Sequence, residues 1–231
     1  MFLTIGLFAN GLYLYRRSRQ RGRTASPLRD LRSQTRAEAS GEQGEHLTQT
    51  KLRETLDWLC KDDYYLHNGP LILVHAPGSP YPTIEIDHLV VTRFGVFVLE
   101  TKHWAGQISP SSNQDGLLRL SRAGMTEERK SPLLQNRSKL AFIRAHLPRQ
   151  WSVAGAGIFT SPEACLSHHL PSDLFALDDL PLWLRTQRDR NASKSPIDVA
   201  KAVRAIVQYQ DRSPTAAAEH KRRVSGNTTV Q

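Results

Sequence analysis

Three residues in the middle of the chain have the types and the spacing needed for metal-assisted phosphodiester chemistry. Asp87 stands within an apolar stretch, residues 83–91, and Glu100 and Lys102 stand at the end of the next such stretch, residues 95–102. Side chains alternate along a strand, so Glu100 and Lys102 point to one face, and pairing of the two strands can bring Asp87 there as well. A carboxylate in a buried strand is costly unless another group compensates for it. The pattern therefore indicates a charged site.

Two carboxylates held together repel each other, and a cation between them removes that cost. Oxygen ligands suit Mg²⁺ or Mn²⁺, which keep several waters and take a substrate phosphate as a further ligand. Such an ion lowers the pKa of a water molecule, and Lys102 could orient that water or hold a phosphate oxygen. Glu45, from a preceding helix, is a plausible third carboxylate, and Glu85 shares the face of Asp87 if its strand is regular. The predicted metal ligands are Asp87, Glu100 and Glu45.

The segments around these residues predict a mixed α/β fold. Residues 41–60 place leucines at near-helical spacing after Ser40, a good N-cap, so we expect an amphipathic helix that carries Glu45. Runs of β-branched and aromatic residues predict strands, and the 92–95 segment reads as a hairpin turn. In order, the predicted elements are a helix at 41–60, strands within 65–75 and at 83–91 and 95–102, short strand pieces at 107–108 and 117–120, a helix at 132–147, a strand at 153–160 and a helix at 196–210. This order predicts a mixed sheet with helices packed on it.

Four sequence motifs follow one another between residues 41 and 150. They are GEQGE at 41–45, EIDHLVV at 85–91, GVFVLETKHWAGQI at 95–108 and SPLLQNRSKL at 131–140. Together they resemble the nuclease-related domain, or NERD, family of the PD-(D/E)xK nuclease superfamily. The resemblance implies a restriction-endonuclease-like core with flanking helices and Mg²⁺- or Mn²⁺-dependent cleavage of nucleic acid, DNA more than RNA. It also implies an active site of Glu45, Asp87, Glu100 and Lys102, with Gln135 as a polar auxiliary.

The positive charge of the chain lies mainly in its flanks. Of the formal net charge of +9, residues 1–40 contribute +6 and residues 211–231 contribute +2, which leaves +1 for residues 41–210. Phosphate attraction by this body must therefore come from a local patch or a bound cation. The neutral body favours an alternative function, a catalytically inactive nuclease-fold module that binds or scaffolds at the membrane. The costly charges at Asp87, Glu100 and Lys102 argue against that alternative.

The N-terminal segment has the pattern of a membrane anchor. Residues 2–15 contain no charged side chain, and five arginines follow within residues 16–23. Fourteen helical residues reach about 21 Å, short of the roughly 30 Å hydrocarbon layer, so a peripheral helix is the alternative to a span. The flanking arginines predict a single-pass protein of a bacterial-type inner membrane with its catalytic domain in the cytoplasm. We expect an anchor at 1–15, a basic polar tether at 16–40, the nuclease-like domain at 41–211 and a disordered tail at 212–231.

Several other polar residues have two interpretations. His88 should point to the face opposite Asp87, where packing is favoured over catalysis. Trp104, beside His103, could stack on a nucleotide, although packing is the simpler role. The two cysteines, Cys60 and Cys165, are too few for a disulfide framework and are expected to be reduced. The basic residues on or just after the 132–147 helix could face phosphates or form a solvated face, and they are Arg137, Lys139, Arg144 and Arg149.

Overall fold

A computed structural model of the chain describes residues 27–226. The chain divides into two compact units, Met1–Ala39 and Ser40–Gln231. The first helix, α2, spans Pro27–Cys60, so the segment expected to be a tether is helical from Pro27 onward. Proline suits the first turn of a helix, and the alanine, arginine, glutamate and glutamine that follow are good helix formers. The anchor predicted at 1–15 lies outside the described residues. Within residues 27–226, no helix is both long enough and apolar enough to cross a membrane.

The central sheet has five strands and is mixed, as predicted. Its order is β1-β4-β5-β9-β11, in which β1, β4 and β5 are antiparallel neighbours while β5, β9 and β11 run parallel. The strands are β1 (Tyr64–Leu66), β4 (His88–Thr92), β5 (Gly95–Lys102), β9 (Val153–Phe159) and β11 (Leu174–Ala176). The predicted turn at 92–95 joins β4 to β5, with the Thr92 hydroxyl accepting hydrogen bonds from the N–H groups of Phe94 and Gly95.

Two smaller sheets accompany the central one. One pairs β2 (Leu71–Val74) with β3 (Thr83–Ile86), and the other has the order β10-β6-β7-β8. The members of the second are β6 (Gly106–Pro110), β7 (Gly116–Leu120), β8 (Thr126–Lys130) and β10 (Ala164–Leu166). The single strand predicted over 83–91 is therefore wrong: the chain leaves one sheet after Ile86 and enters another at His88. Asp87 is the residue between them, where its carboxylate accepts the Thr101 N–H at 2.9 Å.

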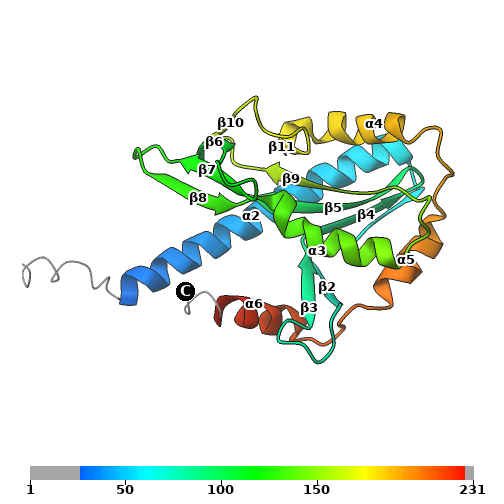
Figure 1. Cartoon of the computed structure of the whole chain (residues 1–231), viewed down its shortest axis with the longest axis horizontal. Coiled ribbons are helices and arrows are strands. Elements are labelled where there is room, and N and C mark those ends of the chain that lie inside the picture. The colour runs from blue at the N-terminus through cyan, green and yellow to red at the C-terminus, as the bar shows by residue number, and fades with distance from the viewer. Residues whose placement is uncertain (1–26, 227–231) are drawn as a thin grey trace, which may run out of the picture. The chain divides into compact units, whose positions relative to one another are not determined.

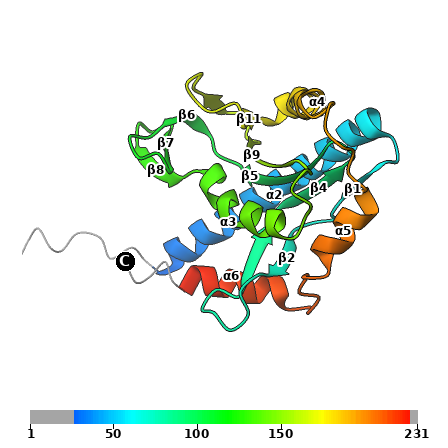
Figure 2. The same ribbon diagram turned by 45° about the vertical axis from the view of Figure 1, so that its right-hand side comes forward.

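Helices cover both faces of the central sheet (Figures 1 and 2). On one face lie α3 (Pro132–Ala145) and α5 (Val199–Val207), and on the other lie α2, from Ser40 on, and α4 (Leu180–Arg190). Alternation along β5 divides the core, with Val96 and Val98 in the first cluster and Phe97 and Leu99 in the second. Because both faces of β5 are buried, its sequence is an almost unbroken apolar run. Residues 161–195, for which no elements were predicted, supply β10, β11, a short 3-10 helix η1 (Leu177–Asp179) and α4, whereas α5 falls within the helix predicted at 196–210.

The C-terminal segment differs from the disordered tail predicted over 212–231. Residues Ala216–Gly226 form a helix, α6, and residues 227–231 lie outside the described part of the chain. The segment starts with three alanines and places Glu219 in its first turn and Arg223 in its last, which are favourable positions for a helix. Packing completes the explanation, because Ala216 is buried and α6 contacts β2 and β3. Both cysteines are free, as expected.

Two glycines of α2 should respond oppositely to the same substitution. A Cβ at Gly44 would lie 2.8 Å from Thr160 Oγ1 and 3.2 Å from the side chains of His103 and Thr101, whereas a Cβ at Gly41 meets nothing within 4 Å. Gly41→Ala should stabilise the helix by up to about 1 kcal/mol. Gly44→Ala should lose that gain to crowding that costs about 1–3 kcal/mol. Urea unfolding of both variants tests this prediction, and equal stability changes would show that α2 does not approach the ends of β5 and β9 so closely.

Candidate active site

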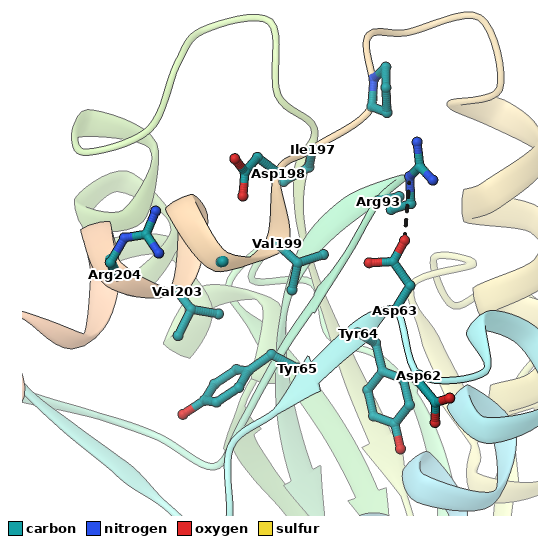
Figure 3. Close-up of a pocket in the computed structure, with 12 residues that line it drawn as sticks. Asp62, Asp63, Tyr64, Tyr65, Arg93, Ile197, Asp198, Val199, Val203 and Arg204 are labelled. Atoms are coloured by element: carbon teal, nitrogen blue, oxygen red, sulfur yellow. Dashed lines mark ion pairs between the residues drawn. The ribbon is translucent and has the colours of Figure 1, made fainter.

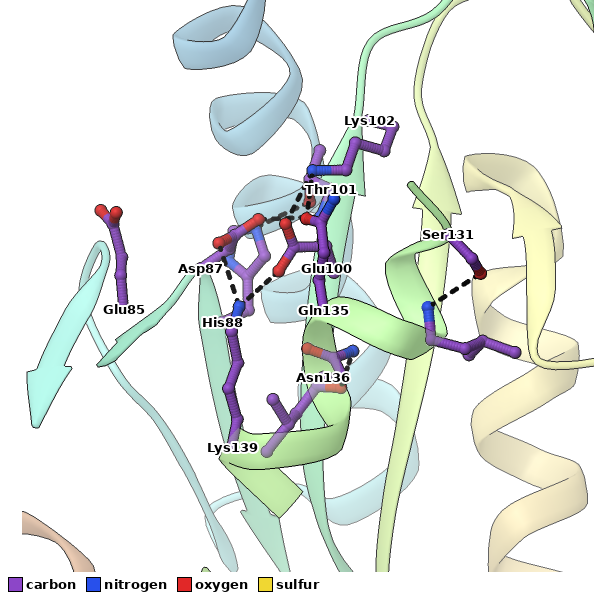
Figure 4. A network of polar contacts seen from close by, with 12 residues as sticks. Glu85, Asp87, His88, Glu100, Thr101, Lys102, Ser131, Gln135, Asn136 and Lys139 are labelled. Carbon is purple, nitrogen blue, oxygen red and sulfur yellow. Dashed lines mark hydrogen bonds and ion pairs between the residues drawn. The ribbon is translucent and has the colours of Figure 1, made fainter. Parts of the chain in front are cut away.

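The end of β5 brings together Glu100, Lys102 and residues of α3 (Figure 4). Lys102 Nζ lies 2.7 Å from Glu100 Oε1, which confirms that these two side chains share a face. The same ammonium donates a hydrogen bond of 2.8 Å to the amide oxygen of Gln135. Lys102 is thus held from two sides, by its own strand and by the auxiliary residue expected from the helix.

A second lysine, Lys139 of α3, joins the cluster one turn after Gln135. Its ammonium donates a hydrogen bond to Glu100 Oε2 at 2.5 Å and lies 4.0 Å from Asp87 Oδ1. The side chains of Lys139, Glu100 and Asp87 are only 11%, 7% and 15% exposed, so these charges lie in a largely desolvated environment. The sequence suggested that Lys139 either faces phosphates or lies on a solvated helical face. Its position fits neither, because it is buried and paired with Glu100. A periodic signal was present in the sequence, because Asn136, Lys139 and Ile143 fall on one helical face and all three are buried.

Asn136 fixes α3 over the sheet and is a positioning residue that the sequence did not suggest. Its side chain is fully buried, and its amide nitrogen donates to the carbonyl oxygens of Val98 at 3.1 Å and Ala156 at 3.0 Å. These carbonyls belong to β5 and β9, two neighbouring strands. The helix begins at Pro132 after Ser131, whose hydroxyl accepts the Leu133 N–H. The helix start and this amide together set where Gln135 and Lys139 meet Glu100.

The two carboxyl groups of the cluster have opposite pKa shifts. Burial, reinforced by the nearby charge of Glu100, raises the pKa of Asp87 to about 7, against the opposing effects of Lys139, the Thr101 N–H and Lys102. Burial would also raise the pKa of Glu100, but the ammonium groups of Lys139 and Lys102 outweigh it and lower that pKa below its usual value. Glu100 is therefore the ionised partner of both lysines. Asp87 is the carboxyl that an additional cation would stabilise most.

Glu45, on α2, lies near this cluster but outside its hydrogen-bond network as the structure describes it. Its side chain is partly buried, and burial, followed by the charges of Glu85 and Glu100, raises its pKa, while Lys221 lowers it. In the described part of the chain, no group of three or more histidine, cysteine, aspartate or glutamate residues is placed to hold a metal ion. The role of Glu45 as a third metal ligand stays a prediction.

Asp87 and Glu100 nevertheless form a donor set that fits a hard divalent cation. Their carboxylates converge on a single position of positive charge, the ammonium of Lys139. Mg²⁺ commonly binds through one or two carboxylates and completes its octahedral shell with waters and substrate phosphate oxygens. Two convergent carboxylates, one of them with a strongly raised pKa, meet that requirement without a third protein ligand.

The histidine and tryptophan near the motifs have structural roles. His88 is buried on the opposite side of the sheet, with Nδ1 2.9 Å from Gln49 Oε1 and Nε2 3.1 Å from Thr101 Oγ1. Burial lowers its pKa to about 4, so it is neutral at physiological pH. Trp104 packs against Phe159 with ring centroids 5.7 Å apart, which confirms packing as its role.

A groove of about 790 Å³ lies at the other end of the central sheet (Figure 3). It is lined by Tyr64 and Tyr65 of β1, by Arg93 in the β4–β5 turn and by residues of α5. Arg93 pairs with Asp63 at 3.5 Å, so its charge is partly compensated. Glu100 is five residues beyond Gly95 along β5, about 16 Å at about 3.3 Å per residue, so the groove is separate from the charged cluster.

A mixed sheet with helices on both faces, carrying an aspartate on one strand boundary and Glu-x-Lys on the next strand, defines a PD-(D/E)xK-like nuclease core. The sequence model described as the nuclease-related domain, NERD, matches residues 40–161, more than half of the chain. The chain therefore belongs to the nuclease-related domain family. No curated protein and no solved structure matched the chain. The matched region contains every predicted site residue and ends before α4, α5 and α6.

Proposed function

We propose that this protein is a divalent-metal-dependent phosphodiester hydrolase that cleaves DNA or RNA, with DNA as the expected substrate. The observation that carries the proposal is the convergence of Asp87 and Glu100 on one cation position, beside a lysine held by two acceptors. A structural ion pair needs one lysine for one carboxylate. Here two lysines contact Glu100, a glutamine holds one of those lysines, and the pKa of Asp87 is still raised.

In this proposal each residue of the cluster has a separate task. Asp87 and Glu100 would hold Mg²⁺ or Mn²⁺, which when bound lowers the pKa of a water molecule and offsets charge on the phosphate. Lys102 uses two of its three N–H donors on Glu100 and Gln135, which leaves the third to hold a phosphate oxygen or orient the attacking water. Gln135 positions Lys102 through its amide oxygen. Lys139 neutralises the second oxygen of Glu100 and limits the repulsion between the two carboxylates.

Divalent ions should stabilise the full-length protein through Asp87 and Glu100. A ligand that binds only the folded state adds about 2.7 kcal/mol when its concentration is a hundred times its dissociation constant. We expect Mn²⁺ at about 5 mM to raise the melting temperature of the wild type, and Asp87→Ala to remove most of that rise. Melting temperatures measured in EDTA, in Mn²⁺ and in Ca²⁺ test this prediction. Asp178→Ala, a substitution on η1 outside the cluster, is the control. Equal melting of the wild type with and without Mn²⁺ would contradict a metal site.

We further propose that residues 1–15 attach the protein to a membrane with its nuclease domain in the cytoplasm. The support is in the sequence, where an uncharged apolar stretch precedes a cluster of arginines. The full chain is expected to sediment with membranes and to resist extraction by high salt, whereas a chain lacking residues 1–15 should remain in the supernatant. Release of the full chain by salt alone would favour a peripheral helix.

The second candidate function is an inactive nuclease-fold module that binds or scaffolds at the membrane. The near-neutral charge of residues 41–210 favours it, because nucleases that grip a polyanion usually present a basic face. The two candidates differ in one measurable property, metal-dependent cleavage of DNA or RNA. A purified full-length protein that binds Mn²⁺ but cleaves neither substrate would favour the second.

A further inference from the structure

Helix α6 lies next to the acidic residues of the candidate active site. It contacts β2 and β3, beside which it runs in both views (Figures 1 and 2). Ala216 is buried, and His220 places Nδ1 2.9 Å from Thr83 Oγ1 and Nε2 3.8 Å from Glu85 Oε2. Strand β3 leads directly into Asp87. The contacts on β3 therefore dock α6 a few residues from the proposed metal ligands.

The exposed residues of α6 are strongly basic. Lys221 and Arg222 are exposed, and Arg223 pairs with Glu219 at 3.2 Å. Burial raises the pKa of Glu45, and the charge of Lys221 opposes that rise. Burial lowers the pKa of His220, and the charge of Lys139 adds to that decrease, so charges of the helix and of the cluster influence each other. Residues 41–210 together carry a net charge of only +1. Helix α6 thus concentrates positive charge where the acidic residues would otherwise repel a polyanion.

We propose that Lys221 and Arg222 of α6 bind backbone phosphates of the nucleic acid near the bond that is cut. This inference rests on the proposed function and adds to it a binding surface outside residues 40–161, the region matched by the family. Glu85 lies 3.8 Å from His220 of α6, and Glu45 is close enough to Glu85, Lys221 and Glu100 for their charges to act on it. Lysine and arginine form charge-assisted bonds with phosphate oxygens, and their contacts with DNA release condensed counterions, which gives them a measurable salt dependence.

The test compares two double variants of the full chain in detergent. Lys221→Glu with Arg222→Glu alters α6, and Arg185→Glu with Lys201→Glu makes the same change of charge on exposed residues of α4 and α5. Binding of a fluorescent DNA duplex of about 20 base pairs is followed by anisotropy from about 50 to 300 mM KCl in EDTA. Loss of two phosphate contacts should reduce the slope of log K against log [KCl] by about 1.8, and the control should keep the wild-type slope. A milder variant, Lys221→Gln with Arg222→Gln, should show the same direction of change with less risk to the helix.

The outcomes separate this inference from the proposed function. If the wild type binds and cleaves DNA but both α6 variants keep its slope, α6 is not a phosphate-binding surface. An equal loss in the α6 and control variants would also overturn the inference, because it would reflect overall charge alone. Stronger binding or faster cleavage by the α6 variants would mean that α6 obstructs the site. If the wild type neither binds nor cleaves nucleic acid, the proposed function itself fails.

Discussion

Lys102→Ala is expected to lower the rate of Mg²⁺-dependent DNA cleavage by about 10²- to 10⁴-fold while leaving the protein folded. The Lys102 ammonium is held 2.7 Å from Glu100 and 2.8 Å from Gln135, which leaves one N–H donor for the reacting groups. Alanine at this position removes that donor. Glu100 keeps Lys139 as a partner, which limits the loss of stability. The measurement is nicking of supercoiled plasmid under single-turnover conditions, with circular dichroism and melting as checks on folding.

Two comparisons make the Lys102 experiment decisive. Lys201→Ala removes an exposed lysine of α5 and should cleave like the wild type. Gln135→Ala should lose less activity than Lys102→Ala, because it only frees the lysine from one of its two acceptors. Cleavage that persists at the wild-type rate in Lys102→Ala would point to a contaminating nuclease or to a different site.

Lys139→Met is expected to lower the free energy of unfolding in EDTA by about 3–5 kcal/mol at pH 8, the usual cost of breaking a buried ion pair. The substitution leaves the carboxylates of Glu100 and Asp87 facing each other with only Lys102 to compensate. The matched control is Lys194→Met, which removes an exposed lysine and should change stability by less than about 0.5 kcal/mol. Urea unfolding gives both values, and a Lys139→Met protein as stable as the control would show that this ion pair contributes little.

The pH dependence and the metal dependence of Lys139→Met follow from the same repulsion. The pKa of Asp87 is already raised to about 7 in the folded wild type, above its value in the unfolded chain. A raised acid pKa means that stability is greatest with the group protonated and falls as the pH rises through the folded pKa. The loss of unfolding free energy in Lys139→Met, relative to the wild type, should therefore become smaller as the pH falls from 8 toward 5. Mn²⁺ should raise its melting temperature more than that of the wild type, because the ion takes the place of the lost ammonium.

Local periodicity was sufficient to place the residues of β5. Because side chains alternate along a strand, Glu100 and Lys102 had to share a face, and their ammonium–carboxylate contact confirms it. The same rule placed His88 on the opposite face from Asp87, where it is buried. The helix predicted at 132–147 corresponds to α3 at Pro132–Ala145, since a proline suits the first turn of a helix and the signals that start and end a helix act within a few residues. These features depend on neighbours in sequence and could be predicted from it.

The path of the chain around Asp87 and the partners of Glu100 were decided by the tertiary structure. The apolar run at 83–91 fits one long strand as well as it fits two short ones. Only the pairing of its first part with β2 and of its second part with β5 divides it at Asp87. Lys139 reaches Glu100 because Asn136 fixes α3 across β5 and β9, a contact between residues 38 positions apart. The tail after residue 212 has little apolar surface of its own, and α6 is held by its contacts with β2 and β3. The sequence by itself indicated which residues form the candidate site. Only the packed structure decided which charges meet, because long-range contacts between elements leave no local pattern in the chain.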